Sequence, residues 1–114
     1  MKVSFVPDVG DILWMSLSLT SGHEQSGHRP VLTLTPAAYN AKRGLLICCP
    51  ITSRIGSYPF EVAVDTEGIS GVVIADQVKS VDWQARRARL AGRASVEVTL
   101  EVRAKLGALL LTDT

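Results

Sequence analysis

The chain has few cysteines, histidines and aromatic residues. Two of its 114 residues are cysteines and two are histidines. The cysteines, Cys48 and Cys49, are adjacent, and neighbours on a strand point to opposite faces, so we expect no disulfide between them. No cysteine or histidine spacing matches a zinc site, so we predict neither a metal nor a cofactor.

The sequence also lacks the features of an exported or membrane protein. Its longest apolar runs, residues 45–49 and 108–111, are far too short to span a bilayer. The residues that follow Met1 show no apolar signal-peptide core. We therefore expect a cytoplasmic protein with no membrane partner, in keeping with its unpaired cysteines.

Neither sign of charge dominates. Twelve lysines and arginines against eleven acidic residues give a net charge of +1, so a nucleic-acid site would have to be a local patch. The length suits a single domain over residues 1–114. Four arginines between residues 86 and 93 could follow phosphates, although such a cluster is more commonly a solvated face.

Short apolar segments separated by turn residues predict a mainly β protein. We expect strands at residues 10–17, 31–35, 45–52, 60–64 and 72–78. Residues 79–83 either continue the last strand or bend away from it. Residues 37–44 are predicted as a polar connection, 65–71 as a turn region and 86–93 as an irregular basic segment.

The end of the chain changes to helical spacing. Val98, Val102, Leu106 and Leu109 share one helical face, which we expect to pack on the core, and Ser95 is a suitable N-cap. No alternation of strands and helices is present, which argues against a parallel sheet. The pattern predicts a small, partly open antiparallel barrel with a C-terminal helix packed on it.

Five segments together resemble the MazF/PemK family of toxins. They are residues 7–14, 22–32, 49–53, 58–62 and 73–80. The most specific part is G-x-E-Q-x-G-x-R-P followed by P-x-T-S, and the segments occur in the order of the family over nearly the whole chain. The resemblance implies an SH3-like antiparallel barrel with a C-terminal helix, working as a homodimer, which agrees with the strand pattern.

The resemblance also implies an activity. Members of the family are toxins of type II toxin–antitoxin systems that cut single-stranded mRNA at specific sequences without a metal and so arrest translation. The 2′-hydroxyl of the RNA attacks the adjacent phosphorus, which leaves a 2′,3′-cyclic phosphate and a 5′-hydroxyl end. The implied protein partner is a cognate antitoxin whose acidic, disordered tail covers the RNA groove.

By family position, Arg29 and Thr52 are the most dependable catalytic residues, and we add Glu24 as a third candidate. A guanidinium presents a fixed fork of donors to phosphate oxygens, and the threonine hydroxyl would add another donor. Glu24, His28 and His23 lie near Arg29 in sequence and could exchange protons, and the choice among them stays open.

The same comparison suggests residues that line the RNA groove. These are Gln25, His28, Ser53, Gln77 and Lys79. Both histidines are more commonly loop residues than catalysts. We expect Trp14 and Trp83 in the core or at an interface rather than stacked on bases.

Two other functions are compatible with this fold. A non-enzymatic poison of DNA gyrase shares it, but that family relies on a tryptophan near its C-terminus, and residues 109–114 contain none. An SH3-like peptide-binding module would need clustered aromatic residues, whereas the six in this chain are scattered. We therefore predict the ribonuclease and keep the gyrase poison as the alternative.

Overall fold

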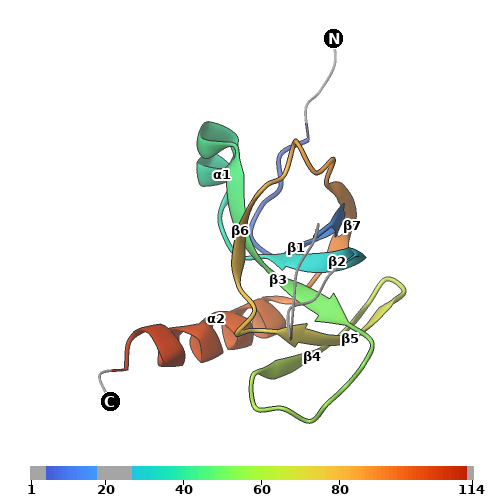
Figure 1. The fold of residues 1–114 in the computed structure, drawn as a ribbon, viewed down its shortest axis with the longest axis vertical. Helices are drawn as coiled ribbons and strands as arrows, with labels where there is room; N and C mark the ends of the chain where they lie inside the picture. The colour runs from blue at the N-terminus through green and yellow to red at the C-terminus, as the bar shows by residue number, and fades with distance from the viewer. Residues whose placement is uncertain (1–4, 18–26, 113–114) are drawn as a thin grey trace.

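The structure is a computed structural model that describes residues 5–17 and 27–112. Its elements are β1 (Asp11–Ser16), β2 (His28–Thr33), α1 (Ala37–Arg43), β3 (Leu45–Thr52), β4 (Glu61–Thr66), β5 (Ile69–Ile74), β6 (Lys79–Asp82), β7 (Arg89–Arg93) and α2 (Val96–Leu110). The strands curl around one another, and α2 lies along one side of them (Figure 1). No helix in the described ranges is long and apolar enough to cross a membrane.

Antiparallel pairing joins the strands into one curled sheet. The order is β4-β5-β3-β2-β1-β7, and β6 also pairs with β3. One edge of β3 pairs with β2, and the other pairs with β6 along its first half and with β5 at its end. The prediction of a mainly β, partly open antiparallel barrel with a C-terminal helix is confirmed.

Burial on both faces explains the apolar run of β3. Cys48 belongs to a cluster with Leu46 and Trp83, whereas Cys49 belongs to a second cluster with Ile51. The two thiols are free and point to opposite faces, as the sequence predicted. Burial raises the pKa of each thiol to about 12, so both stay protonated at neutral pH.

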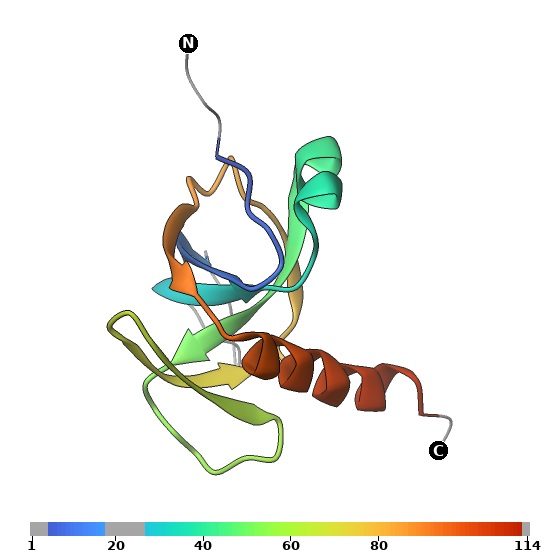
Figure 2. The ribbon, with the colours of Figure 1, turned by 180° about the vertical axis from the view of Figure 1, so that it is seen from behind.

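Helix α2 packs its first turns against the second of these clusters. Ser95 caps it, because the Ser95 Oγ accepts a hydrogen bond of 3.1 Å from the Val98 N–H. Val102 is fully buried, but Leu109 is 46% exposed, so the expectation that Leu109 faces the core is wrong. Figure 2 shows the reason: the last turns of α2 extend beyond the strands.

Two segments without a clear local pattern are regular. Most of residues 37–44, predicted as a polar connection, form α1, and Gly44 caps its C-terminal end in the left-handed conformation at φ 72°. Residues 89–93, predicted as irregular, form β7 because they pair with β1. An ion pair of 2.7 Å between Arg93 and Asp11 lies at the end of that pairing.

Several strand limits also differ from the prediction. Strand β2 begins at His28 and ends at Thr33, because its first residues pair with β1. The turn region at residues 65–71 shortens to a tight hairpin, since β4 continues to Thr66 and β5 starts at Ile69. Residues 79–82 bend away from β5 as a separate strand that pairs with β3.

Asn40 ties α1 to three other segments, two through its side chain and one through its backbone carbonyl. Its Nδ2 donates to the carbonyl oxygens of Pro7 at 2.8 Å and Thr35 at 2.9 Å, and its Oδ1 accepts from the Thr35 hydroxyl at 2.7 Å. The indole N–H of Trp83 donates to the Asn40 carbonyl at 3.0 Å. Asn40 is fully buried, so water cannot replace these partners.

We expect Asn40→Ala to lower the free energy of unfolding by about 2–4 kcal/mol, because it leaves buried polar groups without partners. Urea denaturation at one fixed protein concentration measures the change. Lys42→Ala, on the exposed side of the same helix, is the matched control and should stay within about 0.5 kcal/mol of the parent. An Asn40→Ala midpoint equal to that of the control would contradict the role of Asn40.

Candidate functional site

The register of β2 and β3 brings Arg29 and Thr52 together. Val31 pairs with Pro50, so continuing the antiparallel register by two residues places Arg29 opposite Thr52 and on the same face. Pairing between described residues of these strands stops at Val31 and Pro50. The strands separate there, and a pocket of about 190 Å³ opens, lined by Arg29, Thr52, Ser53 and Arg54.

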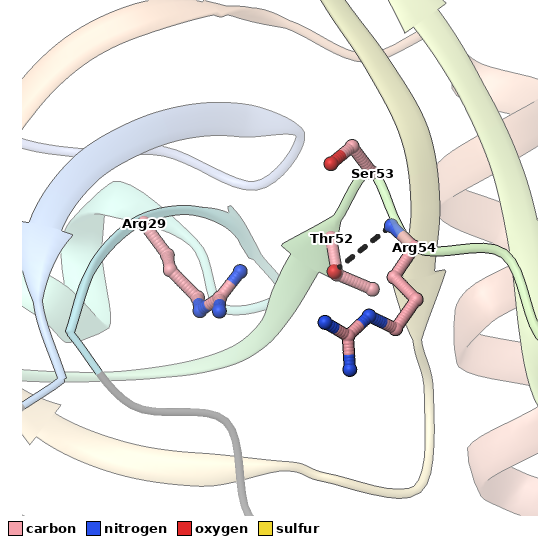
Figure 3. A pocket seen from close by; sticks show the side chains of 4 residues that line it. All are labelled: Arg29, Thr52, Ser53 and Arg54. Atoms are coloured by element: carbon pink, nitrogen blue, oxygen red, sulfur yellow. Dashed lines mark hydrogen bonds between the residues drawn. The ribbon is translucent and has the colours of Figure 1, made fainter.

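Two guanidinium groups point into this pocket, as Figure 3 shows. Arg29 reaches it from β2, and Arg54 reaches it from the loop after β3, with Thr52 beside both. Thr52 is only 6% exposed, whereas Arg54 is exposed. Ser53 is exposed, and its hydroxyl lies on the other side of the chain from the two guanidinium groups.

A tight turn orients the Thr52 hydroxyl. Its Oγ1 accepts a hydrogen bond of 3.2 Å from the backbone N–H of Arg54. A hydroxyl has one proton to donate in addition to its acceptor lone pairs, so the Thr52 proton remains available for a bound group. The same turn fixes the backbone of Arg54 relative to Thr52.

The pocket is cationic. Of the four described residues that line it, two are arginines and none is acidic. Within the described residues, no group of three or more histidine, cysteine, aspartate or glutamate side chains could hold a metal ion. Guanidinium forks and a hydroxyl donor are suited to oxyanions, so the pocket can bind a phosphate group and stabilise negative charge on it.

Gly71 on β5 lets the neighbouring strand approach Thr52 closely. Val72 pairs with Thr52, and a Cβ added at Gly71 would overlap the Thr52 carbonyl group and lie 3.1 Å from the Ser53 Cα. Any larger residue would push the end of β3 away from β5. The position of Thr52 therefore depends on the absence of a side chain at Gly71.

His28 faces a different pocket from the one between Arg29 and Thr52. Consecutive strand residues point to opposite faces, so the His28 side chain points away from that of Arg29. The His28 ring lies edge-on to Trp14, with ring centroids 5.0 Å apart. Both rings line an adjoining pocket of about 260 Å³, which shares Arg29 and Ser53 with the first. The structure thus places His28 beside the cationic pocket rather than in it.

Gln77 and Lys79 lie farther away. Gln77 lines a third pocket of about 400 Å³ with Tyr58 and Asp76. There the Tyr58 hydroxyl donates to the Asp76 carboxylate at 3.1 Å, which raises the pKa of Tyr58. Lys79 pairs with Cys48, four residues before the end of β3, or about 13 Å along the strand.

The remaining predicted residues have three different outcomes. Glu24, Gln25 and His23 lie outside the described residues. Trp83 is buried in the core, as predicted. Within the cluster at residues 86–93, Arg86 donates to the Ser16 carbonyl at 2.8 Å, so at least part of this cluster serves the fold.

Sequence reasoning did not select Arg54. Its only local signal is its place two residues after Thr52, in a loop whose path the sequence pattern does not give. The turn at Thr52 and the separation of β2 from β3 are what bring its side chain to the pocket.

Comparison with a known family accounts for nearly the whole chain. The model of a family described as PemK-like, MazF-like toxins of type II toxin–antitoxin systems matches residues 8–110. The Endoribonuclease toxin MazF of Escherichia coli (strain K12) is 42% identical over 110 residues, which cover 96% of this chain and 99% of that protein.

Solved structures are similar over the same extent. The crystal structure of MazF from Deinococcus radiodurans superposes with a TM-score of 0.90 at 49% identity, and covers 96% of this chain and 100% of that one. A MazE–MazF crystal structure from the same organism gives a TM-score of 0.83 at 46% identity, over 94% of this chain and 97% of that one.

We expect Gly71→Ala to lower the free energy of unfolding by about 1–3 kcal/mol, because the added methyl group collides with the backbone at Thr52. Gly68→Ala is the matched control in the same hairpin: its Cβ would meet no atom within 4 Å, and its positive φ of 82° costs about 1 kcal/mol. Urea denaturation compares the two. A smaller loss for Gly71→Ala than for Gly68→Ala would refute the close approach.

Proposed function

The chain belongs to the family of PemK-like, MazF-like toxins of type II toxin–antitoxin systems, and we propose that it is an endoribonuclease toxin that cuts single-stranded mRNA at the Arg29–Thr52 pocket. The matched curated relatives are named endoribonucleases, which supports the activity and leaves the gyrase poison without support. The observation that carries the site is the convergence of two guanidinium groups and a buried threonine hydroxyl on one pocket.

The proposed reaction uses the substrate's own 2′-hydroxyl. Its oxygen attacks the adjacent phosphorus, and the bond from phosphorus to the 5′ oxygen breaks. The products are a 2′,3′-cyclic phosphate and a 5′-hydroxyl end, and DNA resists because it lacks the attacking group. The reaction needs an acceptor for the 2′ proton, a donor for the leaving 5′ oxygen and donors that stabilise the charged phosphorane.

Arg29 and Thr52 would meet the last of these needs. Both sit at the ends of paired strands, so their donors are held in place before the substrate binds. The described residues that line the pocket include no carboxylate or imidazole, so proton exchange has to come from outside these four residues. We propose Glu24 for that role because it belongs to the same sequence motif as Arg29. His28 lines only the adjoining pocket, so we do not assign proton exchange to it.

The RNA strand would extend from the cationic pocket into its neighbours. Ser53 borders both the Arg29–Thr52 pocket and the pocket that holds His28. A nucleotide next to the cut would therefore contact Ser53 and His28. Gln77 and Lys79 would contact bases or phosphates farther along the strand, and Gln25 completes the proposed groove.

We further propose that the protein is cytoplasmic, forms a homodimer and binds a cognate antitoxin. An acidic, disordered antitoxin tail would complement the cationic pocket and compete there with RNA. The similarity to the MazF chain of a MazE–MazF structure supports an antitoxin partner.

The homodimer predicts a solution mass of twice the chain mass of 12.3 kDa. Light scattering coupled to size-exclusion chromatography measures it across a range of protein concentrations. A single-chain mass at every concentration would rule out the dimer without bearing on cleavage.

We expect Arg29→Ala to slow cleavage about 10²- to 10³-fold, the usual effect of losing an oxyanion donor. Thr52→Val keeps the shape of the side chain and removes one neutral donor, so its loss should be roughly tenfold. The assay incubates a labelled, unstructured RNA with EDTA and identifies the fragment ends.

The same oligonucleotide made fully 2′-deoxy is the control and should stay intact. Circular dichroism checks that each variant is folded. A folded Arg29→Ala protein that cuts at the parent rate would exclude Arg29 from the site. A parent protein that leaves RNA of varied sequence intact would refute the proposed function.

A further inference from the structure

Within the described part of the chain, no partner of the Arg54 side chain explains its position. It is exposed, it points into the same pocket as Arg29 (Figure 3), and its backbone N–H is held by Thr52. Among residues 5–17 and 27–112, its guanidinium makes no hydrogen bond or ion pair, in contrast to Arg93, which pairs with Asp11.

Two guanidinium groups in one pocket favour an anion between them. Two guanidinium groups line one pocket of about 190 Å³, and like charges that share a pocket repel each other. The repulsion is relieved when a group of opposite charge lies between them. Arg29 and Arg54 enter the pocket from different elements (Figure 3), so the two forks could contact one phosphate group bound there.

The charge of the reacting group changes during the proposed cleavage. A phosphodiester carries one negative charge, and attack by a deprotonated 2′-oxygen adds a second as the phosphorane forms. Two guanidinium groups therefore match the phosphorane better than the bound RNA. An interaction that strengthens in this way lowers the barrier of the chemical step rather than merely tightening binding.

We propose that Arg54 is a second catalytic arginine, which contacts the same phosphoryl group as Arg29 and stabilises the second negative charge of the phosphorane. This inference rests on the proposed ribonuclease function. The hydrogen bond from the Arg54 N–H to the Thr52 Oγ1 couples the two residues, so one turn positions both the hydroxyl and the second guanidinium.

The test separates the chemical step from binding. An RNA oligonucleotide that spans a site cut by the parent protein is cleaved with the protein in excess, which gives a saturating rate and a half-saturating protein concentration. The variants are Arg54→Ala, Arg54→Lys and the control Arg43→Ala, which removes an exposed arginine at the end of α1, away from the pocket.

We expect Arg54→Ala to lower the saturating rate roughly 10- to 100-fold, less than for a buried oxyanion donor because Arg54 is exposed. Its half-saturating concentration should change less than about threefold, because the interaction strengthens only in the transition state. Arg54→Lys should fall between the parent and Arg54→Ala, since it keeps the charge and loses the fork. Arg43→Ala should cut at the parent rate.

A second readout does not depend on cleavage. The same RNA with a single 2′-deoxy nucleotide at the cut cannot react, and its affinity for the Arg54→Ala protein should match its affinity for the parent. Thermal unfolding checks the fold, and Arg54→Lys decides the question if Arg54→Ala does not fold.

Two results would overturn the proposal. If Arg54→Ala weakens binding of the deoxy-substituted RNA and leaves the saturating rate unchanged, Arg54 holds a flanking phosphate instead of the reacting one. If it behaves like Arg43→Ala in both assays, it has no role in the site. In either case the parent protein still cuts RNA, so the proposed function stands, whereas a parent protein without activity refutes that function itself.

Discussion

The burial of β3 on both of its faces is the constraint on which the rest of the structure depends. Its alternate side chains enter two separate clusters, with Cys48 in one and Cys49 in the other. A slip of one residue would exchange these faces and turn Thr52 away from Arg29. The packing that holds the sheet together therefore also sets the register of the site.

The site lies where that packing ends. Beyond Val31 the two strands no longer pair, and the cationic pocket occupies the resulting gap. Gly71 holds the far side of β3 against β5, so the buried Thr52 keeps its position beside an open pocket. A chain with a net charge of only +1 can thus concentrate positive charge at one point, so the local cations, rather than the overall charge, set the potential there.

Much of this organisation could be predicted from the sequence. The strand at residues 45–52 was predicted with its observed limits, because a near-continuous apolar run indicates a strand buried on both faces. Ser95 is the N-cap that the pattern indicated, since capping depends on residues three apart. The motif resemblance led to the family and to Arg29 and Thr52, which the structure places in one pocket.

Other features depended on partners distant in the chain. Strand β7 forms because it pairs with β1. Helix α1 contains Asn40, whose hydrogen-bond partners come from other segments. Leu109 is exposed because α2 extends past the sheet. Pairing with β1 extends β2 back to His28. Because side chains alternate along a strand, His28 and Arg29 then point to opposite faces. The sequence by itself determined the local elements, the family and the main candidate residues, because those signals lie within short segments. Only the tertiary structure decided which charged side chains share a pocket, because this depends on strand register and on where strand pairing ends. For that reason the place of Arg54 in the pocket could be found only in the structure.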